Sequence, residues 1–208
     1  MRWPVRSSPT VLALAFAVAL AGGAGARAQS SRESAANPNL TAADLAGTWM
    51  GSQCESDPNS PLSRQRLFVF TETAWKVLVQ MFGDRTCNPS ALLFTADFGG
   101  EYALGANSAA VPGAREARFG FSHKEVTPTA GGIEFLRLRC AQYDWTAEAA
   151  QDVSRGCALF RPVAACPVEY DLTEITGGML RLGDRSHPLC TPAARPTRLQ
   201  ENGFFARQ

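Results

Sequence analysis

Apolar and polar residues alternate with a period of two along much of the chain after Gly47, a pattern typical of strands with one buried face. The clearest case is "AWKVLVQMFG" (residues 74–83), whose apolar row is Trp75, Val77, Val79 and Met81. The preceding run, "RQRLFVFTET" (64–73), alternates in the same way and is joined to it by a short polar stretch. The two runs therefore predict a β-hairpin.

Further strands are expected along the rest of the chain. A pair of glycines, Gly99 and Gly100, predicts a bulge or bend within the first of them. The segments expected to be extended are 91–105, 114–122, 123–129, 133–140 (forming a hairpin with the segment before it), 177–184 and 195–200. Seven or more short strands joined by turns indicate a barrel or a sandwich. Short connections favour an antiparallel meander β-barrel, an open calyx like that of a lipocalin.

Two segments depart from the strand pattern. "TAADLAG" (41–47) carries Thr41 and Asp44 in the spacing of a capping box, which predicts one helical turn. Residues 141–153 mix polar residues with good helix formers, so we expect a short helix or an ordered loop there. The fold class predicted is thus mainly β, with a short helix and a disulfide-stapled C-terminal segment.

The N-terminal residues have the features of a secretory signal peptide. Arg2 and Arg6 precede an apolar run at 11–21, and Ala26-Arg27-Ala28 resembles a cleavage site. The apolar run is too short to cross a bilayer as a helix. We expect a signal peptide over 1–28, a flexible polar arm over 29–40 and one β-barrel domain over 41–208. The protein is then periplasmic or extracellular, with no transmembrane segment in the mature chain.

Charge and cysteine content narrow the class of protein. The chain has 20 basic and 19 acidic residues, so nothing suggests a nucleic-acid partner. An even number of cysteines in an exported chain favours disulfides. From their positions we predict the pairs Cys54–Cys87, Cys140–Cys157 and Cys166–Cys190. The chain has two histidines and no C-x-x-C motif, so we expect no metal site and no cofactor.

Several short motifs occur in an order that resembles the adenomatosis polyposis coli down-regulated (APCDD) domain. They are "LAGTWMGSQCE" (45–55), "MFGDRTCNPSALLF" (81–94), "VPGAREARFGF" (111–121), "LRLGD" (180–184) and "RPTRLQ" (195–200). The resemblance implies a barrel with an apolar, lipid-sized pocket. Animal members of that family resemble membrane-anchored Wnt antagonists, but we expect one domain here where they have two, and no C-terminal membrane helix.

A looser resemblance is to lipocalins, in which the Trp of a G-x-W motif packs beneath an arginine from the last strand. Trp49 and Arg195 are the corresponding residues here, and the resemblance implies a cation–π contact between them at the base of the barrel. In this interpretation Trp49 plugs the barrel and contacts no ligand.

The apolar faces of the strands carry the functional hypothesis. If they line a cavity, they form the apolar wall that ligand sites usually have, and an acyl chain would bind there. The residues predicted to line this pocket are Phe68, Phe70, Trp75, Val77, Val79, Met81, Phe119 and Phe121. The alternative is that the same side chains fill the barrel, leaving a structural or protein-interaction domain of the cell envelope.

Catalysis has little support in the sequence. His187 has Asp184 and Ser186 as neighbours in "GDRSHPLC", but adjacent residues in a proline-bounded turn rarely form a triad. His123, Glu116 and Glu134 are interpreted as surface residues of strands. We therefore predict a protein that is not an enzyme and that binds a lipid, a fatty acid or another apolar small molecule. A peripheral membrane contact stays open, and an esterase or lipid-modifying enzyme is the third hypothesis.

Overall fold

The computed structural model describes residue 37 and residues 39–56 and 59–208, all within one unit, Arg32–Gln208. The predicted signal peptide and most of the predicted arm lie outside the described residues. The strands are β1 (Gly47–Gly51), β2 (Glu55–Ser56), β3 (Ser63–Phe70), β4 (Ala74–Phe82), β5 (Leu92–Asn107), β6 (Arg115–Gly120), β7 (His123–Pro128), β8 (Gln151–Asp152), β9 (Val168–Thr176), β10 (Met179–Gly183) and β11 (Leu199–Arg207). The helices are α1 (Ala42–Leu45) and α2 (Ile133–Arg139), with 3-10 turns η1 (Pro89–Ala91), η2 (Ala130–Gly132), η3 (Val163–Ala165) and η4 (Pro192–Ala194).

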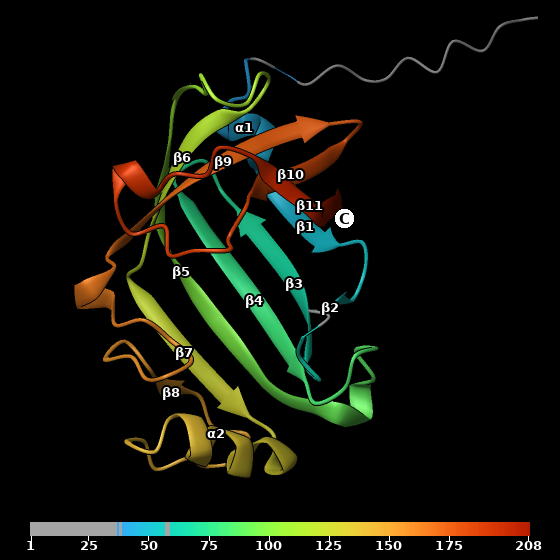
Figure 1. Ribbon diagram of the computed structural model, residues 1–208, viewed down its shortest axis with the longest axis vertical. Helices are drawn as coiled ribbons and strands as arrows, with labels where there is room; N and C mark the ends of the chain where they lie inside the picture. The colour runs from blue at the N-terminus through green and yellow to red at the C-terminus, as the bar shows by residue number, and fades with distance from the viewer. Residues whose placement is uncertain (1–36, 38, 57–58) are drawn as a thin grey trace, which may run out of the picture. The chain divides into compact units, whose positions relative to one another are not determined.

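Eight of the strands close into an antiparallel barrel (Figure 1). The order around the barrel is β1, β3, β4, β5, β6, β9, β10 and β11, and β11 pairs back with β1. Successive barrel strands are therefore neighbours in the chain, apart from the short excursions of β2, β7 and β8. The predicted meander barrel is confirmed.

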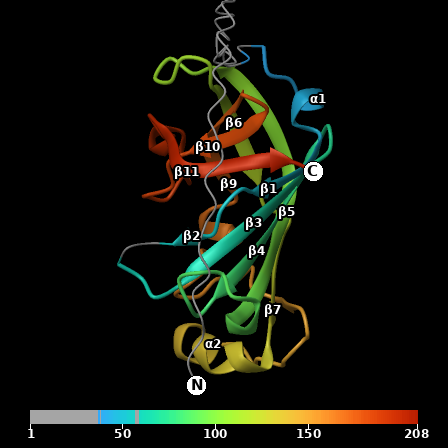
Figure 2. The same ribbon diagram turned by 90° about the vertical axis from the view of Figure 1, so that its right-hand side faces the viewer.

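The long strand β5 extends beyond the barrel (Figures 1 and 2). Its second half pairs with β6, through Tyr102 and Phe119, whereas its first half pairs with β7 from Phe94 to Gly99. Gly99 and Gly100 lie where β5 changes its partner from β7 to β6. Their pairing with β4 on the other side is uninterrupted, so the glycines mark this change of partner and not the predicted bulge or bend. A Cβ at Gly100 would collide with the backbone of the β6–β7 connection, so glycine is needed there.

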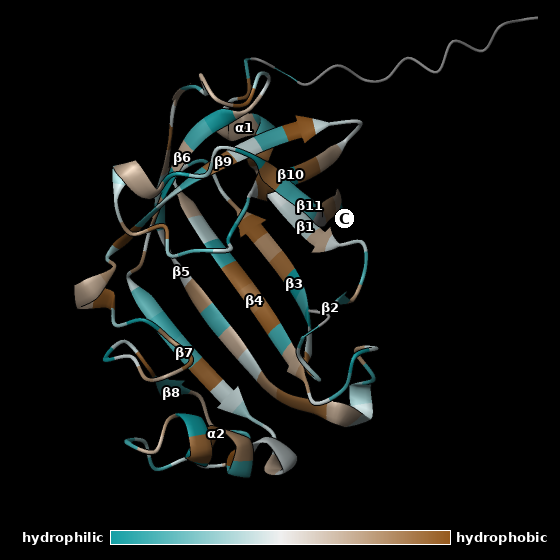
Figure 3. Cartoon of the chain, viewed as in Figure 1, coloured by the Kyte–Doolittle hydropathy of each residue, from teal (hydrophilic) through white to brown (hydrophobic). Residues whose placement is uncertain are grey.

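The sheet register sorts side chains onto two faces, and the hydropathy colouring of β3, β4 and β5 alternates accordingly (Figure 3). One inner row joins Phe68, Val77 and Phe98, and the next joins Phe70 to Trp75. The outer rows include Gln65 opposite Gln80. The period-two pattern of the sequence thus corresponds to an interior and an exterior.

Two apolar clusters form the core. The first fills the barrel and includes Trp49, Phe68, Phe119, Leu180 and Phe205. Helix α1 closes one end of it, since Leu45 and the neighbouring Leu40 are fully buried. The predicted capping box of Thr41 and Asp44 is present, and the Trp49 indole donates to the carbonyl of Leu45 at 2.7 Å. The buried core therefore begins at Leu40, one residue before the predicted domain start.

The second cluster lies where β5, β7 and α2 meet. It includes Phe94, Val126, Leu136 and Trp145. The prediction of a strand at 133–140 is wrong, because residues 133–139 form α2. Its buried positions Leu136 and Cys140 are four residues apart, which is a helical spacing. Residues 141–153 are an ordered loop that ends in β8, whereas β9 and the extension of β11 to Arg207 were not predicted.

All three predicted disulfides are present: Cys54–Cys87, Cys140–Cys157 and Cys166–Cys190. The first joins the segment after β1 to the loop after β4, and the second joins the end of α2 to the loop after β8. The third ties the segment before β9 to the one after β10. No helix in the described part of the chain is long and apolar enough to cross a membrane.

Candidate functional site

The eight residues predicted to line a pocket do share the inner face of the sheet. Phe68, Phe70, Trp75, Val77 and Phe119 belong to the barrel cluster, and Val79 and Phe121 pack against it. Met81 packs against the second cluster. The alternation along the strands therefore identified the side chains that face inward.

These aromatic side chains pack directly on one another. The ring centroids of Trp75 and Phe119 are 5.0 Å apart, and Trp75 and Phe121 are 5.4 Å apart. Phe68 stacks edge-on against Phe205 at 4.9 Å. Such spacings are those of contacting rings. Of the eight residues, Met81 alone lines either of the two cavities described below.

The arginine that lies over Trp49 is Arg207, not Arg195. The Arg207 guanidinium lies 4.7 Å from the centre of the indole ring, and the two residues are register partners on β11 and β1. Arg195 instead donates to the carbonyl oxygens of Ala117 and Asp171 and lies over the ring of Tyr170. The sequence prediction failed because it ended the last strand at Gln200, seven residues too early.

A charged layer lies inside the sheet beyond the aromatic core, and the sequence analysis missed it. Arg66 is 5% exposed and shares the inner face of β3 with Phe68. It donates two hydrogen bonds to Glu55, at 2.7 and 2.9 Å, and one to Gln200 at 2.9 Å. Burial lowers the pKa of Arg66 to about 10, and Glu55 opposes this shift. Arg66 therefore stays protonated at neutral pH and joins β2 to β11.

A second buried ion pair lies across β9 and the segment after β10. Asp171 is fully buried and accepts hydrogen bonds from the backbone of Gly183 at 3.0 Å and from Arg185 at 2.6 Å. Arg185 also donates to Glu169 at 2.8 Å. Its pKa is raised despite its burial, because both carboxylates hold the guanidinium charged. These pairs place cations and acids together on the inner side of the barrel.

The larger cavity, of about 660 Å³, opens beside this charged layer. One side comes from the segment between β1 and the start of β3, and the other from the end of β10 and the start of β11. The described residues that line it are Gln53, Cys54, Glu55, Ser56, Ser60, Leu62, Ser63, Arg64, Met81, Asp184, Arg198, Leu199, Gln200 and Glu201. We call this cavity the cleft. Its volume lies in the range of small-molecule sites, about 300–1,000 Å³.

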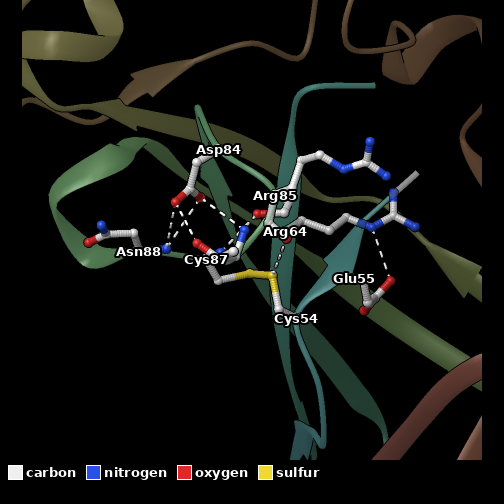
Figure 4. Close-up of a disulfide and its surroundings, with 9 residues drawn as sticks. Cys54, Glu55, Arg64, Asp84, Arg85, Cys87 and Asn88 are labelled. Carbon is white, nitrogen blue, oxygen red and sulfur yellow. Dashed lines mark hydrogen bonds and ion pairs between the residues drawn. A yellow bond between two sulfur atoms is a disulfide. The ribbon is translucent and has the colours of Figure 1, made fainter. Parts of the chain in front are cut away.

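A disulfide holds one wall of the cleft (Figure 4). Cys54, which lines the cleft, is bonded to Cys87, whose backbone N–H donates to Ser63 at 3.1 Å. The turn that carries Cys87 is organised by Asp84, whose carboxylate accepts from Thr86 and from the backbone of Asn88. The Thr86 hydroxyl holds the pKa of Asp84 below its usual range. The Cys54–Cys87 disulfide and this turn together fix β2 against β3.

A smaller cavity, of about 220 Å³, lies on the outer face of the sheet. Its lining includes Met50, Leu67 and Leu78 beside Gln65 and Gln80. Met50 is 37% exposed. This groove is separate from the cleft and shares no lining residue with it.

The Nδ1 atom of His187 lies 3.5 Å from the hydroxyl of Ser186. The Nε2 atom of His187 lies 3.0 Å from the carbonyl oxygen of Ala194, and Asp184 is bonded to Ser186 and Arg198 rather than to the imidazole. His123 lies 3.2 Å from Asp97 on the outer face. Glu116 pairs with Arg195, and Glu134 lies on α2, not on a strand as expected. The described residues contain no group of three side chains placed to hold a metal ion.

One signal in the sequence pointed to the charged layer. Arg64 and Arg66 occupy the same alternating positions as Phe68 and Phe70, so the inward row of β3 begins with two arginines. Their acid partner, Glu55, comes from β2, and no sequence pattern indicates that pairing.

No family model matches the chain, and a search of curated proteins returned no match.

Proposed function

We propose that this protein binds an apolar or amphipathic small molecule, such as a lipid or fatty acid, and catalyses no reaction. The observation that carries the proposal is the cleft of about 660 Å³ beside the inner face of an eight-strand barrel. Met81 belongs both to the predicted apolar row and to the lining of this cleft. The ligand would enter through the cleft and contact the apolar row from Met81 inward.

The resemblance to the APCDD domain supports the same proposal, because that resemblance implies a lipid-sized pocket in a barrel. Wnt antagonism is not part of the proposal. Three disulfides fit an oxidising compartment, so we propose that the protein works in the periplasm or outside the cell. The predicted signal peptide would deliver it there.

A second candidate function is favoured by the packing of the interior. Phe68, Trp75 and Phe119 are 1–4% exposed and in ring contact with their neighbours. A barrel filled in this way needs no ligand for its stability. The protein would then be a structural or interaction domain of the cell envelope, with the cleft or the outer groove as a contact surface.

Mass spectrometry of the protein purified from its native compartment separates the two candidates. A stoichiometric lipid in an organic extract is the result expected for a binding barrel. The absence of such a lipid, together with no binding of fatty-acid or phospholipid probes, would leave the interaction domain. Ester turnover that disappears in His187→Ala would instead favour the enzyme hypothesis.

A further inference from the structure

The two sides of the cleft each carry one arginine held by a carboxylate. Arg64 donates through Nε to Glu55 at 3.1 Å, and Arg198 donates to Asp184 through Nε at 2.9 Å. A second nitrogen of Arg198, Nη2, lies 2.7 Å from the same oxygen of Asp184. Each guanidinium is therefore anchored on the edge that its Nε presents.

The two carboxylates already accept several hydrogen bonds within the protein. Glu55 accepts from Arg64 and, through both of its oxygens, from the buried Arg66. Asp184 accepts from Arg198 and from both the backbone and the hydroxyl of Ser186. The hydrogen bond to Arg198 holds the pKa of Asp184 below its usual range. Most of the acceptor capacity of each acid is therefore used within the protein.

The guanidinium groups, in contrast, keep unused donors. Figure 4 shows the Nε of Arg64 turned to Glu55, while the two terminal nitrogens point away from that carboxylate. No hydrogen-bond partner for these two nitrogens, or for Nη1 of Arg198, lies among the residues that the structure describes. The two side chains are 42% and 66% exposed. Open N–H groups on anchored guanidiniums are suited to carboxylate and phosphate oxygens.

The charge balance of the cleft limits the charge of such a ligand. Glu201 lines the same cleft, and its negative charge adds to the larger effect of Asp184 in raising the pKa of Arg198. The described lining carries two arginines and three carboxylates, and the buried Arg66 behind Glu55 offsets the third, so the cleft has no net positive charge. A ligand anion would therefore be held by the open N–H groups of the arginines, and a group with one negative charge suits such a site better than a group with two.

Most of the lining is polar, but three of its residues suit the start of a hydrocarbon chain. Leu62, Met81 and Leu199 are its large apolar residues. They line the same cavity as the two arginines, so a head group and the first part of its chain can be bound together.

We propose that the cleft recognises the singly charged anionic head group of an amphipathic ligand, a carboxylate or a phosphodiester, through Arg64 and Arg198. This inference rests on the proposed binding function and adds the chemistry of the head group to it. The two arginines are binding residues, and Glu55 and Asp184 position them.

The experiment compares probes that differ only in the head group. Oleate and oleyl alcohol share one chain, and a phosphatidylglycerol vesicle presents a phosphodiester; inorganic phosphate alone tests for a free anion. Binding to the purified protein is measured for the wild type, Arg64→Gln, Arg198→Gln and the double variant. Arg137→Gln, on the exposed side of α2 and outside the cleft, is the matched control.

We expect oleate to bind more tightly than oleyl alcohol, and each cleft variant to weaken oleate binding by about five- to tenfold. Oleyl alcohol binding should change little because the alcohol carries no charge, and the thermal midpoint should change little because partly exposed ion pairs contribute little to stability. Arg137→Gln should change neither quantity. Arg64→Lys should restore part of the affinity. Tight binding of inorganic phosphate alone would identify a free anion as the ligand. The proposal of an amphipathic ligand would then be wrong.

Two negative outcomes have different meanings. If oleate and oleyl alcohol bind equally and the variants change neither, the head-group inference fails while the binding function stands. If neither oleate, oleyl alcohol nor the phospholipid binds, the proposed binding function fails with it.

Discussion

Arg207 on the last barrel strand lies over the indole ring of Trp49 on the first barrel strand. Its guanidinium is 4.7 Å from the ring centre. The first and last barrel strands pair through these two residues. Arg207 also donates to the backbone carbonyl of Asp44 beside α1. Arg207 therefore links the last strand both to β1 and to α1, the helix that closes one end of the barrel.

Removing this contact should destabilise the barrel measurably. Arg207→Ala is expected to lower the free energy of unfolding by about 0.5–1 kcal/mol, the usual worth of an exposed cation–π pair. Urea denaturation measures the loss, and Arg207→Lys should keep part of the energy. A wild-type unfolding curve for Arg207→Ala would show that the contact contributes nothing.

The disulfide Cys140–Cys157 should stabilise the end of the sheet that carries α2. Its cysteines are 17 residues apart, and closing a loop of this size contributes about 3 kcal/mol through the unfolded state. The double variant Cys140→Ser/Cys157→Ser should lose about that amount in urea unfolding. Hydrogen exchange should quicken in α2 first and leave the barrel strands protected. Equal loss of protection in β1 and β11 would contradict this local role.

Lys124 should make stability depend on alkaline pH. Its amine is buried, donates to the carbonyl of Arg161 at 3.1 Å and lies 3.9 Å from the centre of the Phe121 ring. Burial lowers the pKa of Lys124 below 10.5, and Glu169 opposes this shift. The unfolded chain therefore binds the proton more tightly, and folding carries a cost below the folded pKa. That cost disappears as pH rises toward 10.5.

The matched variant is Lys124→Met, which keeps the length of the side chain without its charge. Wild type should gain stability relative to this variant as pH rises from 7 toward 10.5. Thermal midpoints across that range measure the difference. A difference that is constant with pH would mean that Lys124 titrates alike in the folded and unfolded chains.

Asp44 should make the capped helix sensitive to acid. Its carboxylate accepts from both the hydroxyl and the backbone N–H of Thr41, at 2.8 Å each, and these bonds lower its pKa below 3.8. The folded chain therefore binds this proton less tightly, so the stabilisation is present above pH 3.8 and is lost as pH falls through the folded pKa.

Asp44→Ala should cost about 0.3–1 kcal/mol at pH 7, the usual contribution of an acid in the first turn of a helix. The difference from wild type should shrink below pH 3.8, which thermal melts at pH 7 and pH 2.5 can test. Thr41→Ala removes the other half of the capping box and serves as the comparison. A cost that stays the same at both pH values would exclude the carboxylate as its source.

The sequence by itself determined the strands from β3 to β7, the capped turn, the disulfide pairs and the inward row of aromatic residues, but not β9, α2 or the full length of β11. Each of these depends on local information: a period of two at Trp75, Val77 and Val79, a cap spacing at Thr41, or cysteines close to the segments that they join. The helical spacing in α2 was present in the sequence too. It was obscured because Leu136, Leu138 and Cys140 also alternate with Arg137 and Arg139, as residues of a strand do.

Only the tertiary structure decided which charges meet. Gln200 lies 134 residues after Arg66, and closure of the barrel brings the two together, whereas Glu55 meets Arg66 through the neighbouring strand pair β2 and β3. Whether the aromatic row lines a hollow or fills it also depends on the curvature of the sheet, which no residue pattern records. The contact between Arg207 and Trp49 has the same cause, because the first and last strands meet only once the sheet has closed.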